Sequence, residues 1–449
     1  MGTSCVNINS PVFSQTGAYT RGSIPRLTLE NDIDAFLIPS IWPETFSYTT
    51  EEIMKMGMPV MCFDIGAPAE RVKKYEKGII IPKISATSVY ETITRNQVIK
   101  ECCNKKINTQ KILFVVQEVT FSSRYRIDHL REQLIRKGIS SDCVSIKDVK
   151  KCNLKQYNSV VAYRISDFDK LKRLKKKVQK LNKNIFYDID DYIFNYEDIK
   201  DIGFLKGKEY RNYENYTKLI KSCMTLCDGY IVSTLSLKKV IEEQFPGKMV
   251  VINRNVASME MTIASLTVDK VEKDYITLGY FSGTKTHNDD FESIKEELLD
   301  IMRKNVNVHL LIGGQIELPA EFNEVKDQIE TFKFVAWQDL PQLIAKADIN
   351  LMPLENMMFH ECKSENKWME AALVNVPTIA SWNNELATVI KDGVDGFLCK
   401  NSEEWTNKLQ QLVKNENLRK QIAHDAHERV IKEYMTNDVE SEVFKILFN

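Results

Sequence analysis

Short apolar runs alternate with amphipathic stretches along most of the chain. The apolar runs predict buried strands, and they lie at 111–119, 159–164, 184–188, 229–232, 249–252, 275–281, 307–312 and 332–335. The intervening stretches place apolar residues at helical spacing, as in 124–137, 167–182, 205–227, 235–244, 290–303 and 339–346. Strands that alternate with helices predict an α/β fold with parallel sheets.

One pattern occurs twice, in residues 34–78 and 348–396. Each copy has an apolar strand, a loop, a helix that carries glutamate and a β-branched strand. Glu52 and Glu370 each lie seven residues before a proline and twenty-six before a glycine. A shared spacing over that distance implies one supersecondary unit used twice. Because ligands bind outside the carboxyl ends of parallel strands, the repeat marks a candidate ligand site.

We expect three domains in a chain of 449 residues, which is too long for a single core. Residues 1–100 contain the first copy, with strands 33–39, 58–63 and 78–82 and helices 50–57 and 67–76, and form a partial Rossmann-like half-domain. Residues 101–270 and 271–449 form two Rossmann-like lobes that face a cleft. The tail 403–445 is predicted to be helical throughout and able to cross back to the first lobe.

The composition excludes several classes of protein. A net charge of −1 argues against a nucleic-acid partner. The absence of an apolar leader and of any run of eighteen apolar residues argues against secretion and membrane spanning, so we expect a cytoplasmic location. The ten cysteines show no C-x-x-C spacing and are expected to be reduced thiols, with no metal ligands.

A glycine-containing turn follows the predicted strand at 275–281. Free backbone N–H groups at the start of the next helix suit a phosphate or diphosphate, which makes Gly283 and Thr284 candidate donor-binding residues. Lys285 would add a positive charge to the same site. A purely structural strand–helix turn explains the glycines equally well.

Glu370 lies early in the predicted helix 366–374 of the second repeat copy. A carboxylate in that place accepts two hydrogen bonds from a vicinal diol, as acidic residues do with the ribose in dinucleotide sites. Lys363 and Ser364, just upstream, can reach a phosphate at the helix N-terminus. The alternative is a solvated glutamate that interacts favourably with the helix dipole, and the repeat favours the functional interpretation.

Charged residues also follow strands of the first lobe. Asp190 and Asp191 come directly after strand 184–188, and they suit acceptor binding, catalysis or plain helix capping. Candidate acceptor-binding residues follow other strand ends in the same way: Arg124, Arg126 and Arg164. The lysine-rich helix 167–182 suits a peripheral membrane contact, although a solvated face is the simpler explanation.

The second repeat copy resembles the donor lobe of GT-B glycosyltransferases of the family-four type. In that family two glutamates with seven residues between them precede a strand of the form G-x-P-V-[IV]-A-S. The first copy matches with Glu44 and Glu52 followed by GMPV. The second copy keeps Glu370 and VPTIAS but has Cys362 at the first glutamate position. The stretches GYFSGTKTHNDDF, YDIDDYIF and RYRIDHL are similar to a bacterial subgroup of these enzymes.

One further family feature is absent. The arginine and lysine that usually follow the first donor-lobe strand have no match, since Gly283 and Asn288 stand at about those positions. Lys285 is the nearest cation that can substitute for them.

The resemblance implies a sugar transferase that uses a nucleotide-diphosphate sugar as substrate, retains anomeric configuration and needs no metal or other cofactor. The donor would bind residues 271–430, and a glycan or lipid-linked acceptor would bind residues 110–270. The candidate catalytic groups are Asp190, Asp191 and Lys285. The setting that the resemblance implies is bacterial polysaccharide biosynthesis at the inner face of the membrane. A homodimer is a further expectation. A catalytically degenerate nucleotide-sugar binder and a scaffold protein remain as alternatives.

Overall fold

The computed structural model describes residues 33–99, 110–118, 123–200, 208–266, 268, 273–283, 288–436 and 441–448, with four isolated positions before residue 32. The chain forms two compact units. The first comprises Met1–Asn108 with Met259–Ala264, and the second comprises Thr109–Ser258 with Ser265–Asn449. The short helix α11 (Met259–Leu266) therefore belongs largely to the first unit.

The first unit contains a parallel three-stranded sheet in the order β1-β2-β3. Its strands are β1 (Phe36–Ile38), β2 (Val60–Phe63) and β3 (Gly78–Ile81), and its helices are α2 (Tyr48–Lys55), α3 (Gly66–Val72) and α4 (Ala86–Arg95). The central strand is buried throughout, and its alternate side chains enter two small cores, one on each face of the sheet.

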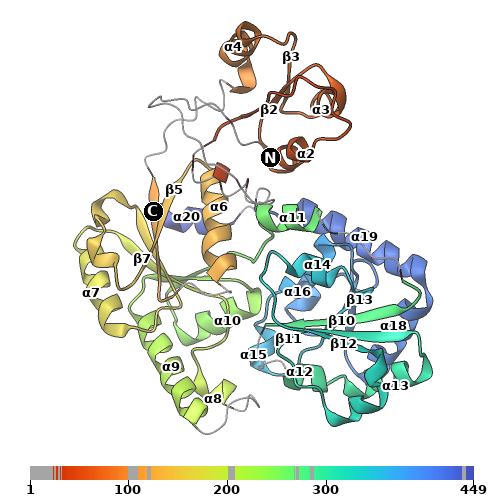
Figure 1. Cartoon of the computed structure of the whole chain (residues 1–449). Helices are drawn as coiled ribbons and strands as arrows, with labels where there is room; N and C mark the ends of the chain where they lie inside the picture. Colours follow the sequence, from red (N-terminus) through yellow and green to blue (C-terminus); the bar gives the residue numbers. More distant parts are fainter. Residues whose placement is uncertain are drawn as a thin grey trace. The chain divides into compact units, whose positions relative to one another are not determined.

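The second unit contains two lobes, each with a six-stranded parallel sheet and helices on both faces (Figure 1). The sheet of the first lobe has the order β5-β4-β6-β7-β8-β9. Its strands are β4 (Lys111–Val116), β5 (Ser140–Ser145), β6 (Ser159–Tyr163), β7 (Asn184–Ile189), β8 (Gly229–Val232) and β9 (Met249–Ile252). Its α-helices are α6 (His129–Arg136), α7 (Phe168–Gln179), α8 (Tyr196–Ile199), α9 (Lys208–Thr225) and α10 (Leu235–Gln244). Three short turns complete it, the π-turn η1 (Arg124–Asp128) and the 3-10 turns η2 (Val149–Lys151) and η3 (Leu154–Gln156).

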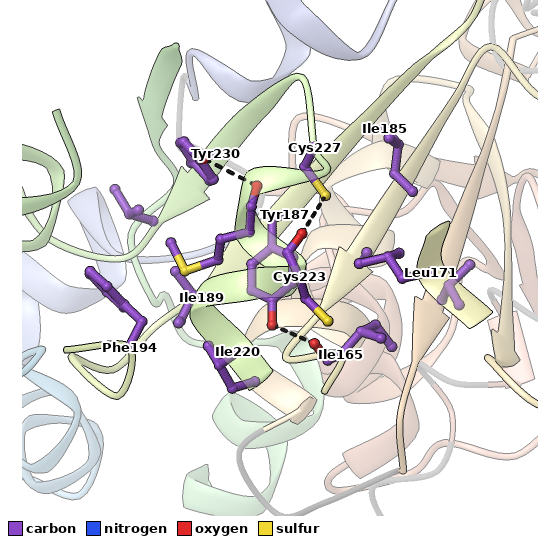
Figure 2. Close-up of a cluster of buried hydrophobic side chains, with 14 of the residues drawn as sticks. Ile165, Leu171, Ile185, Tyr187, Ile189, Phe194, Ile220, Cys223, Cys227 and Tyr230 are labelled. Atoms are coloured by element: carbon purple, nitrogen blue, oxygen red, sulfur yellow. Dashed lines mark hydrogen bonds between the residues drawn. The ribbon is translucent and has the colours of Figure 1, made fainter. Parts of the chain in front are cut away.

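Both faces of this sheet are covered, which explains why β4 is apolar at every position after Lys111. Leu113 and Val115 enter the core on one face, and Ile112 and Phe114 enter the core on the other. Figure 2 shows the first of these cores, where the buried Tyr187 hydroxyl donates to the Ile165 carbonyl oxygen. The core therefore accommodates tyrosine because its hydroxyl has a backbone partner.

The sheet of the second lobe has the order β12-β11-β10-β13-β14-β15. Its strands are β10 (Ile276–Ser282), β11 (Val308–Gly314), β12 (Ile329–Phe332), β13 (Ile349–Met352), β14 (Thr378–Ser381) and β15 (Phe397–Cys399). The α-helices are α12 (Asn288–Glu292), α13 (Lys295–Lys304), α14 (Leu340–Ile344), α15 (Met358–Glu361), α16 (Asn366–Leu373), α17 (Leu386–Val389), α18 (Ser402–Lys414) and α19 (Glu416–Glu433). The 3-10 segment η5 (Ala320–Gln328) is kinked at Val325.

The repeated pattern corresponds to a repeated structure. Strands β13, β14 and β15 pair in the same parallel order as β1, β2 and β3. Val60 pairs with Gly78 and Ile379 pairs with Phe397, which is the same separation along the chain. In the second lobe β13 also pairs with β10, and among the described residues β1 has no such neighbour.

The C-terminal segment leaves the second lobe and ends on the first. Helix α20 (Val443–Leu447), dark blue in Figure 1, lies among the elements of the first lobe. Its apolar residues complete the core beneath β4 and α6, and the Ser159 hydroxyl donates to the Leu447 carbonyl oxygen at 2.8 Å. The two lobes are thus joined by the chain at two places, near residue 258 and near residue 436.

The predicted α/β class, with two Rossmann-like sheets and an additional N-terminal sheet, is confirmed. Several elements differ from the expectation. The edge strand β5 was not predicted because its sequence, SSDCVS, has no apolar run. The predicted helix 290–303 is two helices, and the predicted strand 332–335 lies at Ile329–Phe332. The helical tail is broken at Asn415, whose side chain instead caps α19 by accepting from the Leu418 N–H.

No helix in the described part of the chain has the length and apolar character that crossing a bilayer would require. The seven described cysteines are free thiols.

Candidate functional site

The strand order of the second lobe reverses between β10 and β13, and ligands of doubly wound sheets bind at such a point. A pocket of about 230 Å³ lies there. Gly283 follows β10, while Gly313 and Gly314 end β11, and all three line the pocket. Lys367 and Glu370, one helical turn apart on α16, line it from the other side. The structure therefore brings the predicted Gly283 and Glu370 together.

Lys367 is a site residue that our sequence analysis missed. Its ammonium nitrogen is buried and has no hydrogen-bond partner among the described residues, and it lies 4.4 Å from the centroid of the Tyr280 ring. Burial lowers the pKa of Lys367 to about 8, against the opposing effect of Asp290 and Glu370. A buried cation that lacks a hydrogen-bond acceptor, beside a pocket, is suited to an anionic ligand. Its place three residues before Glu370 is the signal that could have identified it.

The Glu370 carboxylate is held by the other lobe of the same unit. Its Oε1 accepts a hydrogen bond from the Tyr125 hydroxyl and lies 3.4 Å from Nη2 of Arg124. Burial raises the pKa of Glu370, although Arg124, Tyr125 and Lys367 oppose that shift. Glu370, the residue predicted to bind the ribose, thus lies at the boundary between the lobes.

The two predicted catalytic aspartates belong to one ion network with residues of both lobes. Arg164 donates to Asp190 at 2.7 Å and to Asp191 at 2.8 Å, and it does so from a left-handed backbone conformation, with φ of 44°. Lys363 of the second lobe donates to Asp191 at 2.8 Å. Burial opposes ionisation of Asp191, but Lys363 and Arg164 hold its pKa well below the usual range. Asp191 therefore stays ionised and is a poor proton acceptor.

Lys363 and Ser364 are consequently not placed around the pocket. Lys363 points to Asp191, and the Ser364 hydroxyl accepts a hydrogen bond from the Asn255 side chain at 3.1 Å. Thr284 and Lys285, predicted to bind the donor, lie outside the described residues.

The three predicted acceptor-binding arginines have different environments. Arg164 lies in the ion network, and Arg124 contacts Glu370. Arg126 has a structural role, because its side chain and that of Asp188 are both 0% exposed. It donates to the two oxygens of Asp188 at 2.8 and 3.0 Å. Arg126 is not available to an acceptor in this state, which corrects the expectation for that residue.

A second ion group, with two buried glutamates, also joins the lobes. Arg254 lies 3.0 Å from the Glu385 carboxylate and 3.4 Å from that of Glu365, and both glutamate side chains are fully buried. Thr234 donates to the carbonyl oxygen of Cys362 at 3.2 Å. Cys362 is itself a buried core residue.

One group of possible metal ligands occurs in the described part of the chain, formed by Asp290, Glu355 and His360, whose ligand atoms lie within 4.8 Å of one another. Hydrogen bonds within the group hold these residues close together. The Glu355 N–H donates to Asp290 at 3.0 Å, and Nδ1 of His360 lies 3.0 Å from the Glu355 carbonyl oxygen. We assign no metal to it. A larger hollow of about 690 Å³, between α17 and α18, contains none of the predicted site residues.

Comparison with known proteins places this geometry in context. Two family models, both described as "Glycosyl transferases group 1", match residues 276–415 and 17–101. No curated protein sequence matches the chain significantly. Similar solved structures include HepE of Anabaena in complex with UDP, at 13% identity and a TM-score of 0.52, covering 73% of this chain and 96% of that one. The chain has the GT-B fold.

Two further GT-B structures are similar at comparable levels. Sucrose-phosphate synthase of Thermosynechococcus elongatus has 12% identity and a TM-score of 0.51, with 73% of this chain and 95% of that chain covered. TarM of S. aureus has 16% identity and a TM-score of 0.50, with 68% and 57% covered. At these identities the likeness shows the fold. Apart from Tyr125 of the first lobe, the residues that line the pocket belong to the C-terminal lobe and to the segment that matches the family model.

Proposed function

We propose that this GT-B protein is a glycosyltransferase that takes a sugar from a nucleotide-diphosphate sugar. The observation that carries the proposal is the buried ammonium group of Lys367, which has no hydrogen-bond partner among the described residues and lies beside Glu370 in a pocket at the switch point of the second sheet. The UDP bound to the structurally similar HepE supports it. Lys367 would stabilise the diphosphate leaving group as the sugar becomes oxocarbenium-like, and Glu370 would accept hydrogen bonds from the ribose.

The finer assignments follow from the family resemblance. The reaction retains anomeric configuration, and the transferred sugar is a hexose or deoxyhexose. The acceptor is a glycan or lipid-linked molecule of a bacterial cell-surface polysaccharide, bound near Arg164 and the aspartates Asp190 and Asp191. The protein works in the cytoplasm, with the lysine-rich α7 in peripheral contact with the membrane, and it forms a homodimer.

A thermal-shift screen against UDP-, GDP-, dTDP- and CMP-sugars tests the proposal. Specific binding to the native state raises the melting temperature by mass action, so one nucleotide class should give a saturable increase. Transfer of the sugar to a glycan acceptor, or slow hydrolysis in its absence, would then identify an enzyme. An absence of shift with every nucleotide would remove the proposed function.

A catalytically degenerate nucleotide-sugar binder is the second candidate. It is favoured by Cys362, a buried thiol at the position where the family carries its first glutamate. A saturable thermal shift without transfer or hydrolysis would select this candidate.

Replacement of Glu370 by alanine should weaken nucleotide binding by about 1.5–3 kcal/mol, the contribution of a charge-assisted hydrogen bond. Calorimetric titration measures the change. The matched control is Glu52→Ala, which removes the equivalent glutamate of the first repeat copy and should leave affinity and turnover unaltered. If Glu52→Ala abolishes turnover and Glu370→Ala does not, the site belongs to the first unit.

Turnover should persist in EDTA. The positive charge that the diphosphate requires comes from Lys367 in this proposal, so removal of divalent cations should leave the rate within about twofold of the untreated protein, far less than the change that a lost metal charge would cause. Loss of activity in EDTA that Mn²⁺ restores would show that a metal participates. Separate substitutions of Asp190 and of His360 would then show whether the metal binds Asp190 and Asp191 or the group of Asp290, Glu355 and His360.

A further inference from the structure

The carboxylate proposed to bind the ribose is already bonded to two side chains of the N-terminal lobe. Tyr125 and Arg124 both reach the same oxygen, Oε1 of Glu370. The contact is enclosed, since the side chain of Arg124 is 9% exposed and that of Glu370 is 14% exposed. Burial raises the pKa of Tyr125 well above its ordinary value. Tyr125 therefore keeps its proton at neutral pH and is the donor in this contact.

Arg124 makes a further contact with the second lobe. Its guanidinium lies 4.6 Å from the Trp337 ring centroid, in the segment between β12 and α14, and 4.7 Å from the Tyr125 ring centroid. Arg124 and Tyr125 both belong to the π-turn η1, which precedes α6. Such π-turns occur frequently at functional sites. One short turn of the first lobe thus contacts the second lobe at two points beside the pocket.

The pocket in this state is too small for the proposed ligand. Its volume is about 230 Å³, whereas sites for drug-sized ligands span about 300–1,000 Å³. Tyr125 and Glu370 both line it. A ribose diol that bonds both oxygens of Glu370 also needs Oε1, which the two donors of the first lobe share. Entry of a nucleotide therefore requires Tyr125 to move from Glu370.

We infer that Tyr125 and Arg124 form a latch that keeps the nucleotide pocket closed until the nucleotide itself displaces them from Glu370. This inference rests on the proposed function, because it assigns Glu370 to the nucleotide. The latch makes donor entry competitive with a contact between the lobes, so its removal strengthens nucleotide binding. A residue that only positioned Glu370 would have the opposite effect, because its loss would weaken binding.

The test compares two tyrosine substitutions with UDP as the probe, or with whichever nucleoside diphosphate the screen selects. Tyr125→Phe keeps the ring and removes only the hydroxyl. We expect binding about tenfold tighter in calorimetry, equivalent to about 1.4 kcal/mol, near the lower end for a hydrogen bond to a charged group. The control is Tyr157→Phe, which removes a hydroxyl bonded to Asp142 within the first lobe and should leave affinity unchanged.

A second measurement does not depend on any ligand. In the nucleotide-free Tyr125→Phe protein, amide hydrogen exchange should be faster in segments 333–340 and 124–128 than in the wild type. If the wild type binds UDP while Tyr125→Phe binds it equally or more weakly, the latch is wrong and the proposed function stands. If exchange is faster but no nucleotide binds to any of the proteins, the Tyr125–Glu370 contact only holds the lobes together. The inference that a nucleotide displaces this contact is then overturned. If neither quantity changes, the latch is overturned outright.

Discussion

Replacement of Arg126 by methionine should lower the free energy of unfolding of the second unit by about 3–5 kcal/mol, the range for removal of one partner from a buried ion pair. The loss arises because three groups would keep no partner in the core. These are the Asp188 carboxylate, the Asn253 carbonyl oxygen and the side-chain oxygen Oδ1 of Asn255, which lies 3.1 Å from Nη1 of Arg126. Urea denaturation measures the effect as a lower midpoint at an unchanged slope.

The pH dependence of that loss identifies its cause. Burial raises the pKa of Asp188 to about 6 even with Arg126 present, and without the arginine it would rise further. A carboxyl group with a raised pKa in the folded state loses its stabilising contribution as pH increases through that value. The deficit of Arg126→Met should therefore be largest at neutral pH and shrink as the medium is acidified towards pH 5.

A double substitution controls for simple loss of packing. Arg126→Met with Asp188→Leu leaves no unpaired charge, and apolar replacement of a whole buried pair is often neutral or stabilising. The double variant should regain most of the stability at pH 7. If it is as unstable as the single variant, the charge pair is not the reason for the loss.

Much of the architecture was predictable because buried parallel strands have an unmistakable composition. Strand β4 is apolar on both faces, and the repeat fixed the relation between β1–β3 and β13–β15. Strand β5 escaped prediction because an edge strand needs only one neighbour and tolerates SSDCVS. Strand β4 was predictable and β5 was not because β4 is covered on both faces and paired on both edges, whereas among the described strands β5 pairs on one edge only.

The site was predictable only in part. Gly283 and Glu370 meet because strand order places the ends of β10 and β13 side by side, a consequence of topology. Arg124 and Arg126 lie two residues apart on the π-turn, yet Arg124 contacts Glu370 of the second lobe and Arg126 pairs with Asp188 inside the first. Lys363 was assigned to a phosphate because it precedes a helix, yet an aspartate of the other lobe attracts it. Contacts between lobes have no signature in local sequence.

Replacement of Lys367 by methionine should weaken nucleotide binding by about 10- to 100-fold, the range expected when a charged partner of the diphosphate is lost. The same change should stabilise the nucleotide-free protein at pH 7. The Lys367 ammonium group is charged there and makes no hydrogen bond to any described residue, and its pKa is lowered to about 8 because burial disfavours the charge. A substitution that raises stability while it lowers affinity is typical of a binding residue.

The pH profiles of the wild type should run in opposite directions. Between the folded pKa of about 8 and the ordinary value of 10.5, the unfolded chain binds more protons at Lys367, so stability gains a contribution as pH rises through this window. Nucleotide affinity should fall over the same window, because the ammonium group that faces the diphosphate loses its proton. Calorimetric titration from pH 7 to pH 10 and thermal unfolding of the free protein measure the two trends. Lys367→Met should abolish both, and if its affinity still falls with pH like that of the wild type, another group supplies the charge.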